Sequence, residues 1–229
     1  MRKLVIQPDD RILVVAPHPD DETIGCGALI AMYGHQIDIL LITDGYQGHG
    51  EGISDAECIE IRNREIEKVG EMAGIANLYC LLLPDGDSYA HRRVITEFDY
   101  SPYNKVFLPN RLEEHVDHRV ANTTVRKALR KQNVNSDVYE YEVWTTLLFP
   151  NVFLDYSDSA MQKKELLSCY ESQLAMRDYH AMSDGLGLYR GVSCRCRYAE
   201  AYEHVEKKHA LKSLFFRLPI SVQNVLFKS

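Results

Sequence analysis

Hydrophobic and polar positions alternate along the chain in blocks that predict strands and helices in turn. Short apolar runs between turn residues predict buried strands, and longer segments with an apolar residue every three or four positions predict helices. Alternation at this spacing predicts an α/β fold, a Rossmann-like three-layer sandwich in which helices flank a mostly parallel sheet. Five strands are expected, at residues 11–17, 36–43, 77–83, 105–109 and 137–144, with helices at 22–34, 54–74 and 116–132.

The second predicted helix has the clearest end signals. Ser54 and Glu57 have the spacing of a capping box, and Gly74 stands where a left-handed residue commonly ends a helix. No repeat, low-complexity run or flexible linker interrupts the chain. We therefore expect residues 1–229 to form a single domain.

Composition and charge narrow the class of partner. The net charge of −7 argues against nucleic acid, because proteins that bind its backbone carry a basic footprint. No stretch of about 18 uninterrupted apolar residues predicts a transmembrane segment, and the first residues lack a secretory pattern, so a cytoplasmic location is expected. The six scattered cysteines are expected to be reduced thiols. Residues 210–229 are more apolar than a free tail, which predicts docking on the core, on another subunit of a homo-oligomer, or on a membrane surface.

Two polar clusters follow predicted strands. The segment HPDDE, residues 18–22, follows the first strand, and NRLEEHVDHR, residues 110–119, follows the fourth. Ligands of parallel sheets bind beyond the carboxyl ends of the strands. The two clusters are therefore expected at the same edge, although about a hundred residues separate them in the sequence.

These clusters offer the donors of a metal site. His18 and Asp21 are three residues apart, as are His115 and His118, so in a helical turn the members of each pair face one direction. Two imidazoles and a carboxylate with an open fourth position describe a catalytic zinc site. Asp20 is placed to accept a proton from metal-bound water. Taken alone, each cluster has a structural interpretation as a helix cap or a surface turn.

Together these motifs resemble the zinc-dependent N-acetylglucosaminyl deacetylases of the PIG-L/LmbE-like family. The resemblance rests on APHPDDETIGCGALI, LLITDG, the pair Arg62 and Glu65, EEHVDHR, CYESQL and RYAEAY. It implies that His18, Asp21 and His118 bind the metal, that Asp20 is the general base, and that His115 stabilises the oxyanion or protonates the leaving nitrogen. These ligands would accept Zn²⁺, Fe²⁺ or Co²⁺.

The implied reaction removes the N-acetyl group from an N-acetylated amino sugar or glycoconjugate and releases acetate and a free amine. A nearby metal ion disfavours a charged imidazole at His115, so a charged His115 requires Asp117 or another carboxylate to outweigh the effect of the metal. The alternative role for Asp117 is a solvated helix cap. Arg62 matches a substrate-binding position of the family, or it is half of an exposed ion pair on its helix. The other functions considered are a metal-dependent phosphoesterase, which usually needs more carboxylates and a second metal, and a non-catalytic sugar-binding relative.

Polar loops around the site are expected to select the sugar. Residues 44–55 are glycine-rich and contribute Asp44 and Tyr46 as further candidate substrate contacts. Residues 84–93 and 178–191 are expected to form loops of the same kind.

Overall fold

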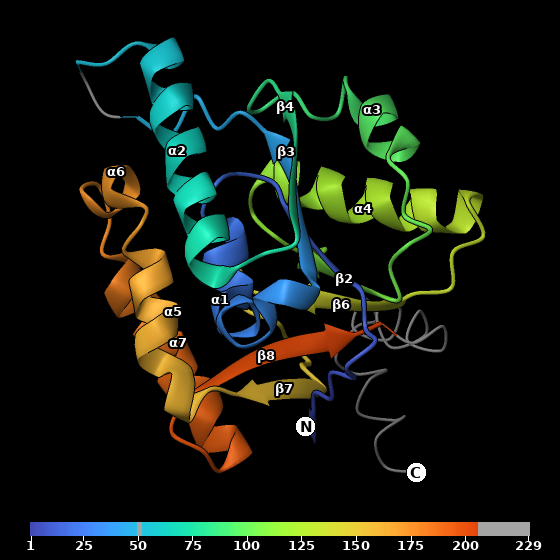
Figure 1. Cartoon of the computed structure of the whole chain (residues 1–229), viewed down its shortest axis with the longest axis vertical. Coiled ribbons are helices and arrows are strands. Elements are labelled where there is room, and N and C mark those ends of the chain that lie inside the picture. Colours follow the sequence, from blue (N-terminus) through green and yellow to red (C-terminus); the bar gives the residue numbers. More distant parts are fainter. Residues whose placement is uncertain (50–51, 206–229) are drawn as a thin grey trace, which may run out of the picture.

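A computed structural model describes residues 1–49 and 52–205, and these form an eight-stranded sheet with helices around it (Figure 1). The strands are β1 (Arg2–Lys3), β2 (Ile12–Ala16), β3 (Ile37–Thr43), β4 (Asn77–Leu83), β5 (Lys105–Pro109), β6 (Asp137–Tyr141), β7 (Val152–Asp155) and β8 (Ala199–His204). The α-helices are α1 (Asp21–Tyr33), α2 (Asp55–Ala73), α3 (Arg92–Glu97), α4 (Val116–Lys131), α5 (Ala160–Leu167), α6 (Glu171–Leu174) and α7 (Tyr179–Cys194).

The sheet is mostly parallel, as predicted. Its strand order is β1-β7-β8-β6-β5-β2-β3-β4, and β8 alone pairs antiparallel with both of its neighbours. Strand β2 pairs with β3 on one side and with β5 on the other. The chain runs from β2 through β3 to β4 at one edge of the sheet and then returns to the other side of β2 as β5. The crevice beyond the carboxyl ends of β2 and β5 is therefore the topological switch point, where ligands of such sheets bind.

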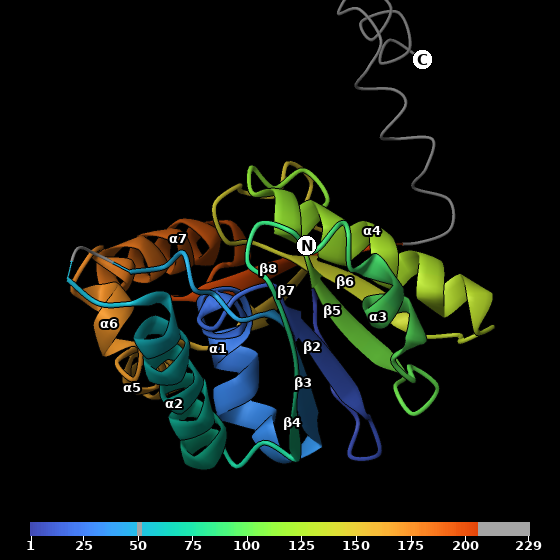
Figure 2. The same cartoon turned by 90° about the horizontal axis from the view of Figure 1, so that it is seen from above.

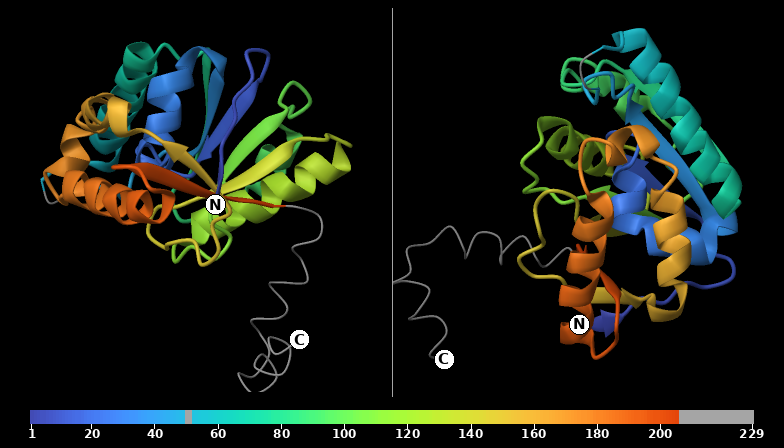
Figure 3. Two further views of the ribbon diagram at one scale, coloured as in Figure 1. Left: turned by 90° about the horizontal axis from the view of Figure 1, so that it is seen from below. Right: turned by 90° about the vertical axis from the view of Figure 1, so that its left-hand side faces the viewer.

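Helices cover both faces of the sheet (Figure 2). Alternate residues of β2 point to opposite faces: Val14 packs into the cluster that includes α1 and α2, whereas Leu13 and Val15 pack with α3 and α4. Helices α5, α6 and α7, orange in Figure 3, extend the first layer, on the other side of the sheet from α3 and α4. The predicted three-layer sandwich is confirmed.

The five predicted strands and three predicted helices are present, with small shifts at their ends. The capping box of Ser54 and Glu57 is formed, and Gly74 is left-handed at φ 63°. The last predicted strand ends at Tyr141 rather than at residue 144. The additional strands and helices are mostly short, and a short segment carries too little periodicity to be recognised.

The predicted loop at residues 178–191 is wrong, because most of it belongs to α7. The Asp178 side chain caps this helix by accepting from the Ala181 backbone N–H at 2.9 Å. A Cβ at Gly187 would lie 2.0 Å from the Tyr156 hydroxyl. Glycine at that position thus permits close packing rather than a turn.

Helix α1 is kinked at Cys26 (φ −132°, ψ 17°), and an ion pair occupies the kink. The Ile24 carbonyl accepts from the Lys163 ammonium at 3.1 Å, and the Ala28 N–H donates to the Glu200 carboxylate at 2.7 Å. Lys163 and Glu200 are themselves 2.7 Å apart. Side chains from α5 and β8 therefore replace the hydrogen bond that the kink removes from the helix.

No helix within the described residues is long and apolar enough to cross a bilayer. The six cysteines lie in this part of the chain and are unpaired thiols. The predicted docking of residues 210–229 lies outside the described residues.

Candidate active site

The turn between β2 and α1 places the first cluster at the switch point. Asp20 has φ 125°, a backbone conformation that side chains disfavour. Its own N–H donates to the Glu22 carboxylate at 3.2 Å, and its carbonyl accepts from Thr23 and Ile24 at the start of α1. The Tyr170 hydroxyl donates to the other oxygen of Glu22. The strained turn is thus held by buried hydrogen bonds from both sides.

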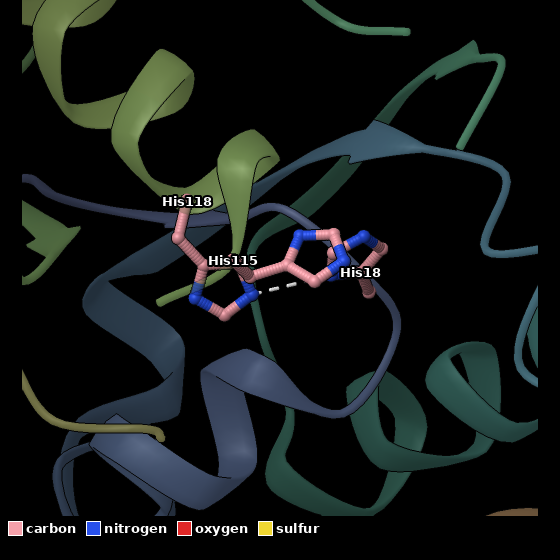
Figure 4. Close-up of side chains that lie close together, drawn as sticks. All are labelled: His18, His115 and His118. Atoms are coloured by element: carbon pink, nitrogen blue, oxygen red, sulfur yellow. Dashed lines mark hydrogen bonds between the residues drawn. The ribbon is translucent and has the colours of Figure 1, made fainter. Parts of the chain in front are cut away.

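His18, Asp21 and His118 bring their donor atoms together beyond this turn, and Figure 4 shows the two histidines with His115 beside them. His18 Nδ1 lies 3.2 Å from Asp21 Oδ2 and 3.3 Å from His118 Nε2, and the last two atoms are 3.1 Å apart. Zinc bonds of about 2.0–2.1 Å in a tetrahedron separate the ligand atoms by roughly 3.3 Å. The three atoms therefore fit three corners of such a site, with a fourth corner for water or substrate.

His115 brings a further ring nitrogen within 4.8 Å of those of His18 and His118. A second group of possible ligands combines His18 and His115 with Asp85 and Asp117. Both groups share His18 and His115, and the two carboxylates of the second group lie on the Nε2 side of the His18 ring.

The charges around His18 favour a cation. Its Nε2 lies 3.0 Å from Asp85 Oδ1 and 3.5 Å from Asp117 Oδ2. Burial lowers the pKa of His18, but hydrogen bonds with Asp117, Asp21 and Asp85 outweigh burial and raise it well above the ordinary value. Burial also opposes ionisation of Asp21, but the neighbouring His118 outweighs it and lowers the pKa of Asp21. The carboxylates around His18 thus outnumber the cationic groups, and a bound proton or metal ion would balance their charge.

Asp20 lies beside the three donors and pairs with Arg62. Burial raises the pKa of Asp20 to about 8, although Arg62 opposes the shift. The Arg62 guanidinium is 3.2 Å from Asp20 Oδ2 and donates to the backbone carbonyls of Pro19 and Gly45. Arg62 is only 3% exposed, so the predicted exposed helix ion pair is wrong.

The other half of that expected ion pair, Glu65, bonds elsewhere. Its carboxylate accepts from the backbone N–H and the hydroxyl of Ser172, each at 2.7 Å. Glu65 therefore joins α2 to α6.

His115 begins α4 at the mouth of the site. Its ring stands edge-on to that of His18, with centroids 4.6 Å apart. Nδ1 accepts from the Asp117 backbone N–H at 3.3 Å, which assigns the proton of the neutral ring to Nε2. Burial and the charges of His18 and His118 lower the pKa of His115. The expected charged imidazole is therefore not favoured.

Asp117 is fully buried, so the solvated helix cap is wrong. It accepts from the Gly86 N–H at 2.8 Å and from the Ser88 N–H and hydroxyl. Its Oδ2 lies 3.8 Å from His115 Nδ1. Asp117 thus joins α4 to the loop after β4 and faces both His18 and His115.

A cavity of about 390 Å³ opens over the cluster, within the size range of small-molecule sites. Trp144 and Arg177 face one another across its outer part, with the guanidinium 4.9 Å from the indole ring. The lining comprises His18, Asp20, Asp21, Gln47, Gly48, His49, Arg62, Asp85, His115, Trp144, Gln173, Met176, Arg177 and Tyr179. Asp85 was not singled out from the sequence, although it directly follows β4 and the rule that identified His18 applies to it.

Asp44 and Tyr46 lie outside this lining, and their contact with substrate stays a prediction. Asp44 Oδ1 accepts from the backbone N–H groups of Tyr46 and Asp85, each at 3.2 Å, and thereby shapes the loop after β3. A Cβ at Gly48 would lie 2.2 Å from Arg62 Nη1. Glycine there allows the loop to lie directly against Arg62.

Comparisons with known proteins agree with this arrangement. The family model PIG-L, described as GlcNAc-PI de-N-acetylase, matches residues 13–129. Diacetylchitobiose deacetylase of Thermococcus kodakarensis is 25% identical in an alignment that covers 85% of this chain and 83% of the relative.

Solved structures share the fold. N,N'-diacetylchitobiose deacetylase from Pyrococcus horikoshii superimposes with a TM-score of 0.73 at 22% identity, covering 87% of this chain and 88% of that one. GalB, the 4-carboxy-2-hydroxymuconate hydratase from Pseudomonas putida, gives a TM-score of 0.67 at 17% identity, covering 87% and 97%. One architecture thus occurs in proteins named for two different reactions.

Proposed function

The chain belongs to the PIG-L family of de-N-acetylases, and from this premise we propose that it hydrolyses the N-acetyl group of an N-acetylated amino sugar. The observation that carries the proposal is the meeting of the His18, Asp21 and His118 donor atoms within 3.3 Å, with Asp20 buried beside them. The products would be acetate and a free amine.

We assign His18, Asp21 and His118 as the residues that hold a zinc ion. The N/O donor set and the surplus of carboxylates support this assignment, and Fe²⁺ or Co²⁺ would fit the same donors. When bound, the ion would polarise the acetamide carbonyl and lower the pKa of water in the site. The remaining steps are assigned to side chains of this chain.

Asp20 is the proposed general base. Burial favours its uptake of a proton, and Arg62 fixes one oxygen of its carboxylate. The hydrogen bond from the Asp20 N–H to Glu22 holds the backbone in its strained conformation. Arg62 thus serves as a positioning residue, and because it lines the cavity we also retain it as a substrate contact.

His115 is the proposed stabiliser of the oxyanion. With Nδ1 occupied by the Asp117 N–H, the neutral ring presents an Nε2–H donor. A neutral donor can stabilise developing negative charge without carrying a charge itself. This favours stabilisation of the oxyanion over protonation of the leaving nitrogen as the first role of His115.

The cavity supports a substrate larger than an acetamide. Polar side chains lie near the cluster and Trp144 and Met176 contribute apolar surface, a combination suited to a sugar ring. Curated and structural relatives named as diacetylchitobiose deacetylases make an N-acetylated disaccharide the first substrate to test.

A hydratase is a second candidate because GalB shares the fold, and a phosphoesterase and a non-catalytic sugar-binding protein are further alternatives. The deciding experiment measures acetate release by metal-loaded protein from N-acetylglucosamine, N,N'-diacetylchitobiose and other N-acetyl amino sugars. Asp20→Asn is the inactive control. Parallel assays follow phosphate release from phosphoesters and water addition to 4-carboxy-2-hydroxymuconate. The proposal is refuted if no sugar yields acetate while one of the parallel assays shows turnover. A cytoplasmic location and a homo-oligomeric state stay predictions.

A further inference from the structure

Two buried atoms without partners face one another behind the proposed metal ligands. They are His118 Nδ1 and Glu113 Oε2, and neither has a hydrogen-bond partner within the described part of the chain. They lie 3.9 Å apart, and both side chains are completely buried. An unsatisfied buried polar atom destabilises the fold, so each atom gains by approaching the other.

His18 provides a comparison within the same site. Its Nδ1 faces the proposed metal position, while its other nitrogen, Nε2, pairs with the Asp85 carboxylate at 3.0 Å. Histidines that bind metals usually donate their second N–H to a carboxylate or carbonyl, which fixes the ring and its tautomer. Glu113 is the carboxylate in the corresponding position behind His118.

The second oxygen of Glu113 is already engaged. Oε1 accepts from the backbone N–H groups of Val143 and Thr145 at 3.2 and 3.0 Å. These residues flank Trp144, whose indole forms part of the outer cavity. One carboxylate therefore touches both the segment that carries Trp144 and the back of His118.

We infer that Glu113 is a positioning residue that joins His118 to the Trp144 segment, with Oε2 accepting from His118 Nδ1–H and Oε1 holding the backbone on both sides of Trp144. This inference rests on the proposed role of His118 as a metal ligand. A short rotation would bring the two atoms to hydrogen-bond distance, about 2.7–3.2 Å.

The first test measures Zn²⁺ affinity of metal-free protein by competition with a chromophoric chelator. In Glu113→Gln the amide oxygen can keep both backbone hydrogen bonds, but its NH₂ then faces the His118 N–H, donor against donor. The expected loss is about 10- to 100-fold in affinity, as for other partners of metal-bound histidines. Glu114→Gln, the matched change at the exposed neighbour, should retain wild-type affinity. Wild-type affinity in Glu113→Gln would overturn the His118 half of the inference.

The second test uses fluorescence, because Trp144 is the single tryptophan of the chain. Glu113→Ala removes both backbone hydrogen bonds and should change the Trp144 emission spectrum, whereas Glu113→Gln should leave it unchanged. An unchanged spectrum in Glu113→Ala would refute the inference that Glu113 holds the backbone on both sides of Trp144.

Two controls separate this inference from a structural role and from the proposed function. Metal-free Glu113→Gln should unfold within about 10 °C of the wild type, because it loses one buried hydrogen bond; a larger drop would assign Glu113 to fold stability and overturn the inference. His118→Ala should lose Zn²⁺ binding. If His118→Ala binds Zn²⁺ like wild type, the proposed ligand set is wrong. If His118→Ala loses Zn²⁺ binding but Glu113→Gln keeps wild-type affinity, the role of Glu113 is refuted and the proposed ligand set is retained.

Discussion

Replacing Asp20 by Asn should lower the activity of the enzyme and raise the folding stability of the metal-free protein. Asp20 is 5% exposed, and burial raises its pKa to about 8 from the 3.8 of an exposed side chain. Between these two values the unfolded chain releases the Asp20 proton while the metal-free folded protein retains it. Folding stability therefore falls as pH rises from about 4 towards 8.

The magnitude follows from this pKa difference. At pH 7 the shift costs the metal-free protein up to about 4 kcal/mol at 1.36 kcal/mol per pH unit. Asn carries no charge and removes this cost. Asn keeps an acceptor oxygen for the Arg62 guanidinium, so loss of that hydrogen bond subtracts little from the gain. At roughly 2–4 °C per kcal/mol for a chain of this size, the unfolding temperature rises measurably.

The assay is thermal unfolding of metal-free wild type and Asp20→Asn at pH 7 and at pH 4. The variant should be the more stable protein at pH 7, and the difference should shrink at pH 4, which is close to the unfolded-state pKa of 3.8, so that little of the linkage remains. Acetate release at pH 7 should fall by about 10²–10⁴-fold while bound metal is retained. A stability difference that is the same at both pH values refutes the assignment of the raised pKa to Asp20, and near wild-type turnover moves the role of base to another group.

Further predictions concern the other residues of the site. His118→Ala should lose bound metal and activity together with little change of fold, and full metal occupancy by elemental analysis would remove His118 from the ligand set. His115→Ala should keep the metal and lower kcat by about 10²–10³-fold without changing the alkaline limb of the pH profile; a flattened limb would show that a charged imidazole acts. Gly48→Ala places a Cβ 2.2 Å from Arg62 Nη1 and should cost about 1–3 kcal/mol of unfolding free energy in urea. The control is Gly185→Ala in α7, where a Cβ meets nothing within 4 Å and the change should stabilise by about 0.5–1 kcal/mol; equal effects in the two variants would contradict the packing argument.

Much of the site is predictable because it follows directly from strand ends. His18 and His118 are close to buried strands that pair in parallel, so the topology alone brings them to one edge. Asp85 and Glu113 are harder to recognise, because each has a second carboxylate close by in the sequence and only the fold decides which of the two faces a histidine. Their roles depend on which ring nitrogen each one faces.

The outer cavity and the last third of the chain depend on tertiary packing. Trp144 and Arg177 are distant in sequence and meet only because α6 and α7 fold back over the switch point. The glycines of α7 resemble turn residues until Tyr156 is seen packed against Gly187. Local propensity predicts the central strands well because burial and propensity agree there, and it fails where a neighbouring element decides the conformation.

The ion pair in the kink of α1 has a consequence for how the protein matures. All three proposed metal ligands are synthesised within the first 118 residues of the chain. The helix that begins at Asp21 nevertheless receives the Lys163 ammonium and the Glu200 carboxylate at its kink, and Glu200 belongs to β8, the last strand within the described residues. The ligands therefore leave the ribosome long before the helix beside them can take its final shape. We therefore expect the proposed metal ion to enter the finished site only after the strand that carries Glu200 has been added to the sheet.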